Sequence, residues 1–156
     1  MTLKEKLQND LKETLKSGDT EKRDTLRLLL SAVSNREIEN KGRGKEGALT
    51  DEEVVEVLGK EAKKRKESIE AYTKGGRADL VEKEEKELQA IKAYLPEELG
   101  EEEIVNIVHE AIQVIRPESM KDFGKVMGEV AKRTKGRADN AKVSKLVKEK
   151  MQNIET

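Results

Sequence analysis

The sequence predicts an all-α protein built from two small helical subdomains. Leu, Ala, Glu and Lys dominate its 156 residues, and runs of β-branched and aromatic residues bounded by turns are missing. Charged residues make up 42% of the chain and hydrophobic residues 34%, with only one Phe, two Tyr and no Trp. Apolar residues recur at helical spacing along most of the chain. This composition supports modest cores only, because little apolar surface is available for burial.

The first subdomain, residues 1–95, is expected to hold about four helices. Thr2 and Glu5 have capping-box spacing, so a helix should begin there and end at Gly18. Asp19 or Thr20 caps a second helix, which should fade where a glycine-rich loop begins.

A long helical hairpin completes this subdomain. Thr50 caps its first helix, Gly75 ends that helix, and Pro96 ends the second one. Charged residues interrupt both apolar stripes, Arg65 in one helix and Glu84 in the other. Either each lies at the edge of its stripe and reaches solvent, or the two pair across the hairpin and specify its register.

The second subdomain, residues 96–156, is expected to contain three helices. Its charge is unevenly distributed: residues 97–119 carry seven Glu against one Arg, whereas residues 121–151 carry ten Lys and Arg against four Asp and Glu. An acidic helix therefore precedes a basic helical pair. Gly124 and Gly128 lie one turn apart on the first basic helix, and each costs about 1 kcal/mol relative to alanine. Close approach of another helix or of an RNA backbone would offset that cost.

The basic pair and the turn within it are the candidate RNA-binding surface. Clustered Lys and Arg side chains attract phosphates, and a turn between two helices projects such side chains into solvent. The candidate RNA-binding residues are Lys132, Arg133, Lys135, Gly136, Arg137, Lys142 and Lys145.

Several motifs resemble those of the GatB/YqeY family in order and spacing. The C-terminal ones are Gly124-Lys125-Val126-Met127-Gly128, Lys135-Gly136-Arg137-Ala138-Asp139 and Val147-Lys148-Glu149-Lys150-Met151. The upstream ones are Lys22-Arg23, residues 26–30, Gly76-Arg77-Ala78-Asp79-Leu80, residues 84–88 and Tyr94-Leu95-Pro96. The resemblance covers most of the chain and implies a stand-alone YqeY-like protein. Its C-terminal subdomain is then similar to the three-helix tail of the B subunit of glutamine-dependent aminoacyl-tRNA amidotransferases, an appendage that contacts tRNA.

No catalytic constellation accompanies the resemblance. The chain has no Cys and one His, and its serines stand outside any nucleophile motif. His109 is expected to be an ordinary surface residue, and we expect no catalytic residue, metal or cofactor. The family implies the label of a carbon–nitrogen ligase with glutamine as amido donor. That label is not expected to describe this chain acting alone.

Three functions remain open from the sequence. The first is a non-catalytic protein that binds tRNA or another structured RNA. The second is a protein-interaction adaptor, whose N-terminal hairpin or acidic fifth helix binds a partner. The third is an accessory subunit of an amidotransferase. No apolar run approaches the roughly 18 residues that a membrane span requires, so no membrane partner is expected and the location is expected to be cytoplasmic. The sequence leaves the oligomeric state open.

Overall fold

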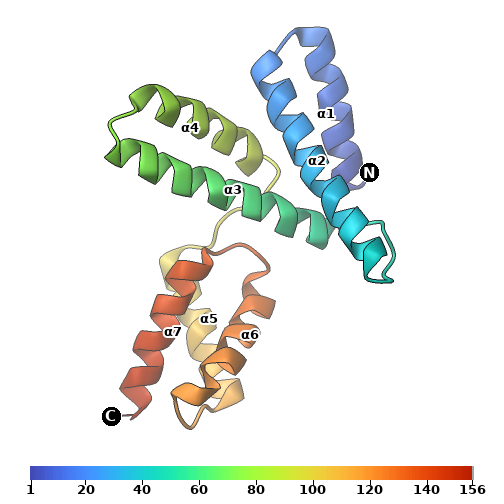
Figure 1. Cartoon of the computed structure of the whole chain (residues 1–156). Coiled ribbons are helices and arrows are strands. Elements are labelled where there is room, and N and C mark those ends of the chain that lie inside the picture. Colours follow the sequence, from blue (N-terminus) through green and yellow to red (C-terminus); the bar gives the residue numbers. More distant parts are fainter. Residues whose placement is uncertain (156) are drawn as a thin grey trace. The chain divides into compact units, whose positions relative to one another are not determined.

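A computed structural model describes residues 1–155, and these residues contain seven α-helices, one short 3₁₀ turn and no strand, which confirms the all-α prediction (Figure 1). The chain divides into two compact units, residues 1–95 (unit 1) and 96–156 (unit 2). Each unit has its own hydrophobic core.

The first two helices of unit 1 are α1 (Leu3–Ser17) and α2 (Thr20–Gly42). The Thr2 hydroxyl accepts a hydrogen bond from the Glu5 amide at 3.1 Å, as its capping spacing predicts. Gly18 ends α1 with a φ of 77°, a left-handed conformation that glycine adopts without steric cost. Asp19 then caps α2 by accepting from the Lys22 amide at 3.1 Å.

The other two helices of unit 1, α3 (Asp51–Lys74) and α4 (Ala78–Lys92), form the expected hairpin (Figure 1). Thr50 caps α3, because its hydroxyl accepts from the Glu53 amide at 3.2 Å. Helix α4 begins without a side-chain cap, since its N-cap residue is Arg77, whose guanidinium has no acceptor atom and instead donates to the Asp79 carboxylate. That hydrogen bond with Arg77 is the main cause of the lowered pKa of Asp79.

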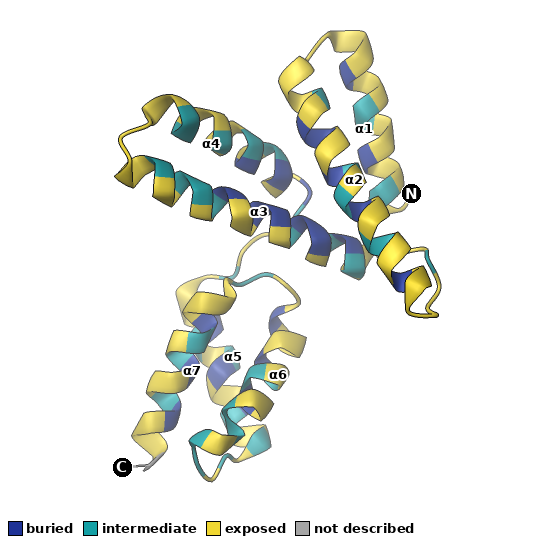
Figure 2. Ribbon diagram, in the orientation of Figure 1, coloured by how far each residue is buried: buried dark blue, intermediate teal, exposed yellow. Residues whose placement is uncertain are grey.

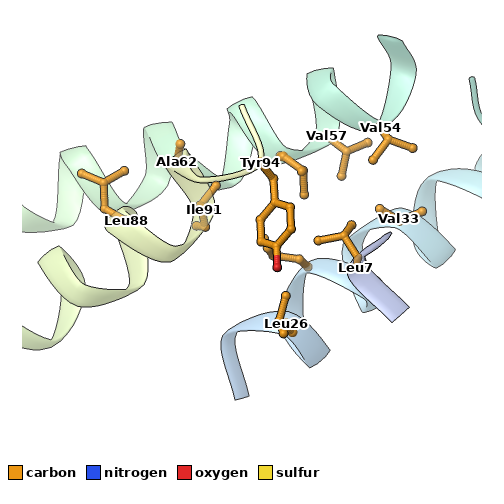
Figure 3. Packing of buried hydrophobic residues seen from close by; sticks show 11 residues of the cluster. Leu7, Leu26, Val33, Val54, Val57, Ala62, Leu88, Ile91 and Tyr94 are labelled. Carbon is orange, nitrogen blue, oxygen red and sulfur yellow. The ribbon is translucent and has the colours of Figure 1, made fainter. Parts of the chain in front are cut away.

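The core of unit 1 is aliphatic and draws on all four helices (Figures 2 and 3). Leu7, Leu26, Leu58 and Ile91 come from different helices and are all fully buried. Tyr94 is the aromatic member of this cluster, and its hydroxyl donates a hydrogen bond to Asp10 of α1. Burial is the main reason why the pKa of Tyr94 is raised, and the Asp10 carboxylate adds to it. Tyr94 therefore ties the end of α4 to α1.

The charged residue that interrupts the apolar stripe of α3, Arg65, is buried and bound to two carboxylates. Arg65 is only 8% exposed, so it does not reach solvent at the edge of its stripe. Its guanidinium binds Glu61 at 2.7 Å and Glu87 at 3.3 Å, so of the two alternatives a pair across the hairpin forms, but with Glu87, one helical turn from the suggested Glu84. The reason is register. Arg65 lies nine residues before the last residue of α3, and Glu87 lies nine residues after the first residue of α4.

Unit 2 consists of α5 (Glu101–Ile115), the 3₁₀ turn η1 (Met120–Asp122), α6 (Phe123–Thr134) and α7 (Asn140–Glu155). One face of each α-helix supplies the core. Four of the core residues are completely buried: Val108, Val126, Val130 and Val147. Asp139 caps α7, its carboxylate accepting from the Ala141 amide at 3.0 Å. The three helices thus close around a second, smaller core (Figure 2).

The two glycines of α6 face open space. A Cβ placed on Gly124 or Gly128 would meet no atom within 4 Å among the described residues, so no helix packs closely against them. Of the two explanations open from the sequence, close helix packing is excluded within the described chain. The backbone of α6 is left bare at this surface.

We predict that Arg65→Met destabilises unit 1 by about 3 kcal/mol, because the buried Glu61 loses its closest cationic partner and keeps only the mostly exposed Lys64, while Glu87 loses its ion pair with Arg65. Both tyrosines, Tyr72 and Tyr94, lie in unit 1, so tyrosine fluorescence during urea unfolding reports on this unit. The double variant Arg65→Met/Glu61→Leu should recover most of the loss. A midpoint for Arg65→Met equal to that of the wild type would contradict this role of the ion pair.

Replacing Gly128 by Ala should stabilise unit 2 by about 1 kcal/mol, since the added methyl group meets nothing and the helix backbone gains rigidity. Thermal unfolding followed by circular dichroism should show the gain, while the tyrosine signal of unit 1 stays unchanged. A loss of stability would mean that the site is crowded in solution.

Candidate nucleic-acid interface

The turn between α6 and α7 holds two consecutive residues in the left-handed conformation. Lys135 caps α6 with a φ of 47°, and its amide donates to the Ala131 carbonyl at 3.1 Å. Gly136 follows with a φ of 77°. A glycine adopts the left-handed conformation without steric cost, whereas a lysine rarely does. Both conformations reverse the chain tightly and leave Lys135 and Gly136 exposed.

Arg137 does not project freely from this turn. Its Nε donates to the Glu97 carbonyl at 2.9 Å, and its own carbonyl accepts from the Leu99 amide at 2.8 Å. The side chain is half-buried as a result. A backbone acceptor such as the Glu97 carbonyl has no signature in a sequence, so this contact could not be predicted from the residue pattern.

Arg133 is held by carboxylates on two sides. Its Nη1 lies 3.0 Å from Glu110 of α5, and its Nε lies 3.1 Å from Glu129 of α6. Two negative neighbours offset its charge and occupy its donors. Of the candidate residues, Arg133 is therefore the least available to a phosphate.

Four candidate lysines remain exposed, and none forms an ion pair within the part of the chain that the structure describes. They are Lys132, Lys135, Lys142 and Lys145. Because they flank the short connection between the end of α6 and the start of α7, they gather at one end of unit 2. Further along α7, the Lys148 ammonium lies over the Phe123 ring, 5.7 Å from its centroid, which is within the roughly 6 Å limit of a cation–π contact. We call the four exposed lysines and Arg137 the basic end.

An acidic segment lies beside the basic end. The hydrogen bond from Leu99 to Arg137 brings the start of α5 next to the turn, and Glu101, Glu102 and Glu103 fill the first turn of α5. These carboxylates are favourable there because a helix N-terminus carries partial positive charge. Unit 2 as a whole holds eleven Lys and Arg against twelve Asp and Glu. The positive charge is thus a local feature of the basic end.

Asp122 organises the entry to α6. Its carboxylate accepts from the Glu118 amide at 2.9 Å and lies 3.7 Å from the Lys125 ammonium. The backbone hydrogen bond from Glu118 is the main cause of the lowered pKa of Asp122, and Lys125 contributes.

Other possible sites are less developed. His109 is exposed, and no group of three or more His, Asp or Glu side chains in residues 1–155 is arranged to hold a metal ion. A cleft of about 1320 Å³ opens within unit 1 along α4 and the start of α2, and charged side chains of both signs line it. None of the described helices is long and apolar enough to cross a bilayer.

Comparison with known proteins identifies relatives along nearly the whole chain. The family model of the YqeY-like proteins matches residues 4–151. The protein named "Altered inheritance of mitochondria protein 41, mitochondrial" from Pyrenophora tritici-repentis is 33% identical over 147 residues, which are 92% of this chain and 78% of that protein. Its namesake from Saccharomyces cerevisiae is 30% identical over 80% of this chain and 68% of that protein. The namesake from Eremothecium gossypii is 36% identical over 57% of this chain, and the match spans about half of that relative, 46%.

These names correct one expectation from the sequence. A cytoplasmic location was expected because no apolar run approaches the length of a membrane span, whereas the relatives are named as mitochondrial proteins. The names point away from a cytoplasmic location, so the composition of a chain was too weak a basis for placing it. The family itself is clear from the extent of the match: this chain belongs to the YqeY-like protein family.

Proposed function

We propose that this protein is a non-catalytic RNA-binding protein that docks tRNA, or an RNA of similar shape, on the basic end of unit 2. The observation that carries the proposal is the gathering of four exposed lysines without acidic partners at that end. When surface lysines without counter-charges contact the phosphates of a nucleic acid, the cations condensed on the nucleic acid are released, and this release drives binding. The resemblance of this unit to a tRNA-contacting tail supports the same RNA class.

Recognition in this proposal depends on phosphates and shape. Stacking of bases uses exposed aromatic rings, and the one Phe, Tyr or Trp side chain of unit 2, Phe123, is half-buried beneath Lys148. The bare backbone at Gly124 and Gly128 permits an RNA backbone to approach α6 without meeting side chains. Affinity should therefore depend strongly on salt and weakly on sequence.

The adaptor function is the second candidate, and the cleft of unit 1 is the observation that favours it. The cleft lies between α4 and the start of α2, and residues of both charge signs line it, so it suits a protein segment of mixed charge. An accessory role in an amidotransferase would need partner chains to supply every catalytic group.

The central test is binding of bulk tRNA measured by fluorescence anisotropy at about 50 mM salt, where phosphate contacts are strong. Lys142→Glu/Lys145→Glu should weaken binding about tenfold or more and flatten the dependence of log affinity on log salt. Lys60→Glu/Lys63→Glu changes the net charge equally at two exposed lysines of α3 and should leave binding within about twofold. Equal affinities for the two variants would reject the basic end as the RNA site.

A change of opposite sign gives an independent check. Glu101→Gln/Glu102→Gln removes two negative charges next to the basic end, so we expect tRNA affinity to rise severalfold, most clearly at low salt. The same substitutions at Glu67 and Glu70 of α3 serve as the control. An increase that is the same for both pairs would indicate a general charge effect and no local docking at this end.

A further inference from the structure

The segment that leads into unit 2 is bound to the α6–α7 turn. Residues 97–99 precede α5, yet two hydrogen bonds join them to Arg137, one to the Glu97 carbonyl and one from the Leu99 amide. The Leu99 side chain also packs against the core of unit 2. The packed structure of unit 2 therefore begins at Glu97, several residues before its first helix.

The end of unit 1 is anchored as well. The Leu95 amide donates to the Lys92 carbonyl at 3.1 Å, and Tyr94 is buried and bound to Asp10. Between the bonded Leu95 amide and the bonded Glu97 carbonyl stands Pro96, whose ring fixes φ. While Arg137 holds the Glu97 carbonyl, only Pro96 lies between these two hydrogen-bonded residues. Losing the Arg137 contact would lengthen the stretch of chain that no such bond holds.

Arg137 keeps part of its binding capacity for a second acceptor. A guanidinium has five N–H donors in one plane, and the Glu97 carbonyl accepts from only one of them, the Nε–H. The two terminal nitrogens have no hydrogen-bond partner among the described residues. The hydrogen bond of Nε to the Glu97 carbonyl fixes the plane of the guanidinium. The two terminal nitrogens therefore point in a set direction, as end-on binding of a phosphate requires. Arg133 differs, since carboxylates occupy its Nε and a terminal nitrogen.

We propose that Arg137 is a positioning residue that couples RNA binding to the connection between the two units. Its Nε holds the Glu97 carbonyl while its terminal nitrogens bind an RNA phosphate, so bound RNA tightens residues 97–99. By reciprocity of coupled equilibria, loosening these residues weakens RNA binding. The coupling rests on the proposed function, whereas the hold of Arg137 on residues 97–99 does not.

The hold is tested first without RNA, by NMR hydrogen exchange on the full chain. Arg137→Lys keeps the charge but removes Nε, so exchange of the Leu99 amide should speed up about tenfold, the effect of losing one charge-assisted hydrogen bond. Arg116→Lys is the matched control, because the Arg116 side chain makes no hydrogen bond among the described residues. The Val143 amide, bonded to the Asp139 carbonyl at 3.0 Å, serves as a reference for the folding of unit 2. Unchanged exchange at Leu99 overturns the proposal.

A measurement on the wild type covers the case in which Arg137→Lys unfolds unit 2 and speeds exchange at Val143 too. The Nε–H of Arg137 should exchange at least about tenfold more slowly than that of Arg116, which lacks an acceptor. Equal Nε–H exchange rates for the two arginines would show that Arg137 does not hold residues 97–99, and this result needs no variant.

Saturating bulk tRNA then tests the coupling. Exchange at Leu99 should slow severalfold in the wild type, and Arg137→Lys should bind tRNA more weakly than Arg116→Lys. If tRNA binds and exchange at Leu99 does not change, the coupling is refuted while RNA binding stands. If tRNA does not bind, both the proposed function and the coupling fail, and the RNA-free experiment still decides whether Arg137 holds residues 97–99.

Discussion

Each helix of this protein has a narrow apolar face, and the fold depends on these faces meeting in groups of three or four. With 42% of its residues charged, the chain cannot cover a helix on all sides with apolar contacts. In unit 1 the fully buried Leu7, Leu26, Leu58 and Ile91 each come from a different helix, so no pair of helices holds a complete core. The same constraint explains why both cores are almost entirely aliphatic and why one tyrosine at the end of α4 can connect several helices.

Local features of the fold could be predicted from the sequence, whereas register could not. Thr2, Asp19 and Thr50 cap their helices as their spacing indicates, since capping involves residues three apart in the chain. The hairpin of α3 and α4 was also predictable from its glycine turn. The partner of Arg65 was not, because a shift of one turn changes which carboxylate faces it. Stripe positions alone do not distinguish Glu84 from Glu87.

The candidate site shows the same division between local and distant information. The sequence indicates a basic helical pair, and the structure leaves four of its lysines exposed and unpaired within the described chain. It cannot indicate that Glu110 neutralises Arg133, or that Arg137 binds a carbonyl forty residues upstream. Nor can the sequence indicate that the acidic start of α5 lies beside the α6–α7 turn. Counting charges along a stretch omits neighbours from elsewhere in the chain, and here those neighbours confine the positive charge to one end of unit 2.

The division of the chain at Leu95 and Pro96 has a consequence for biosynthesis. Each unit is formed by one uninterrupted stretch of sequence, and all contacts of the first core lie within the first 95 residues. As a chain leaves the ribosome from its N-terminus, the first four helices can assemble before the last three have been translated. The acidic and basic segments of the second unit are then synthesised after the first unit has folded, which reduces the chance that helices of the two units pair wrongly.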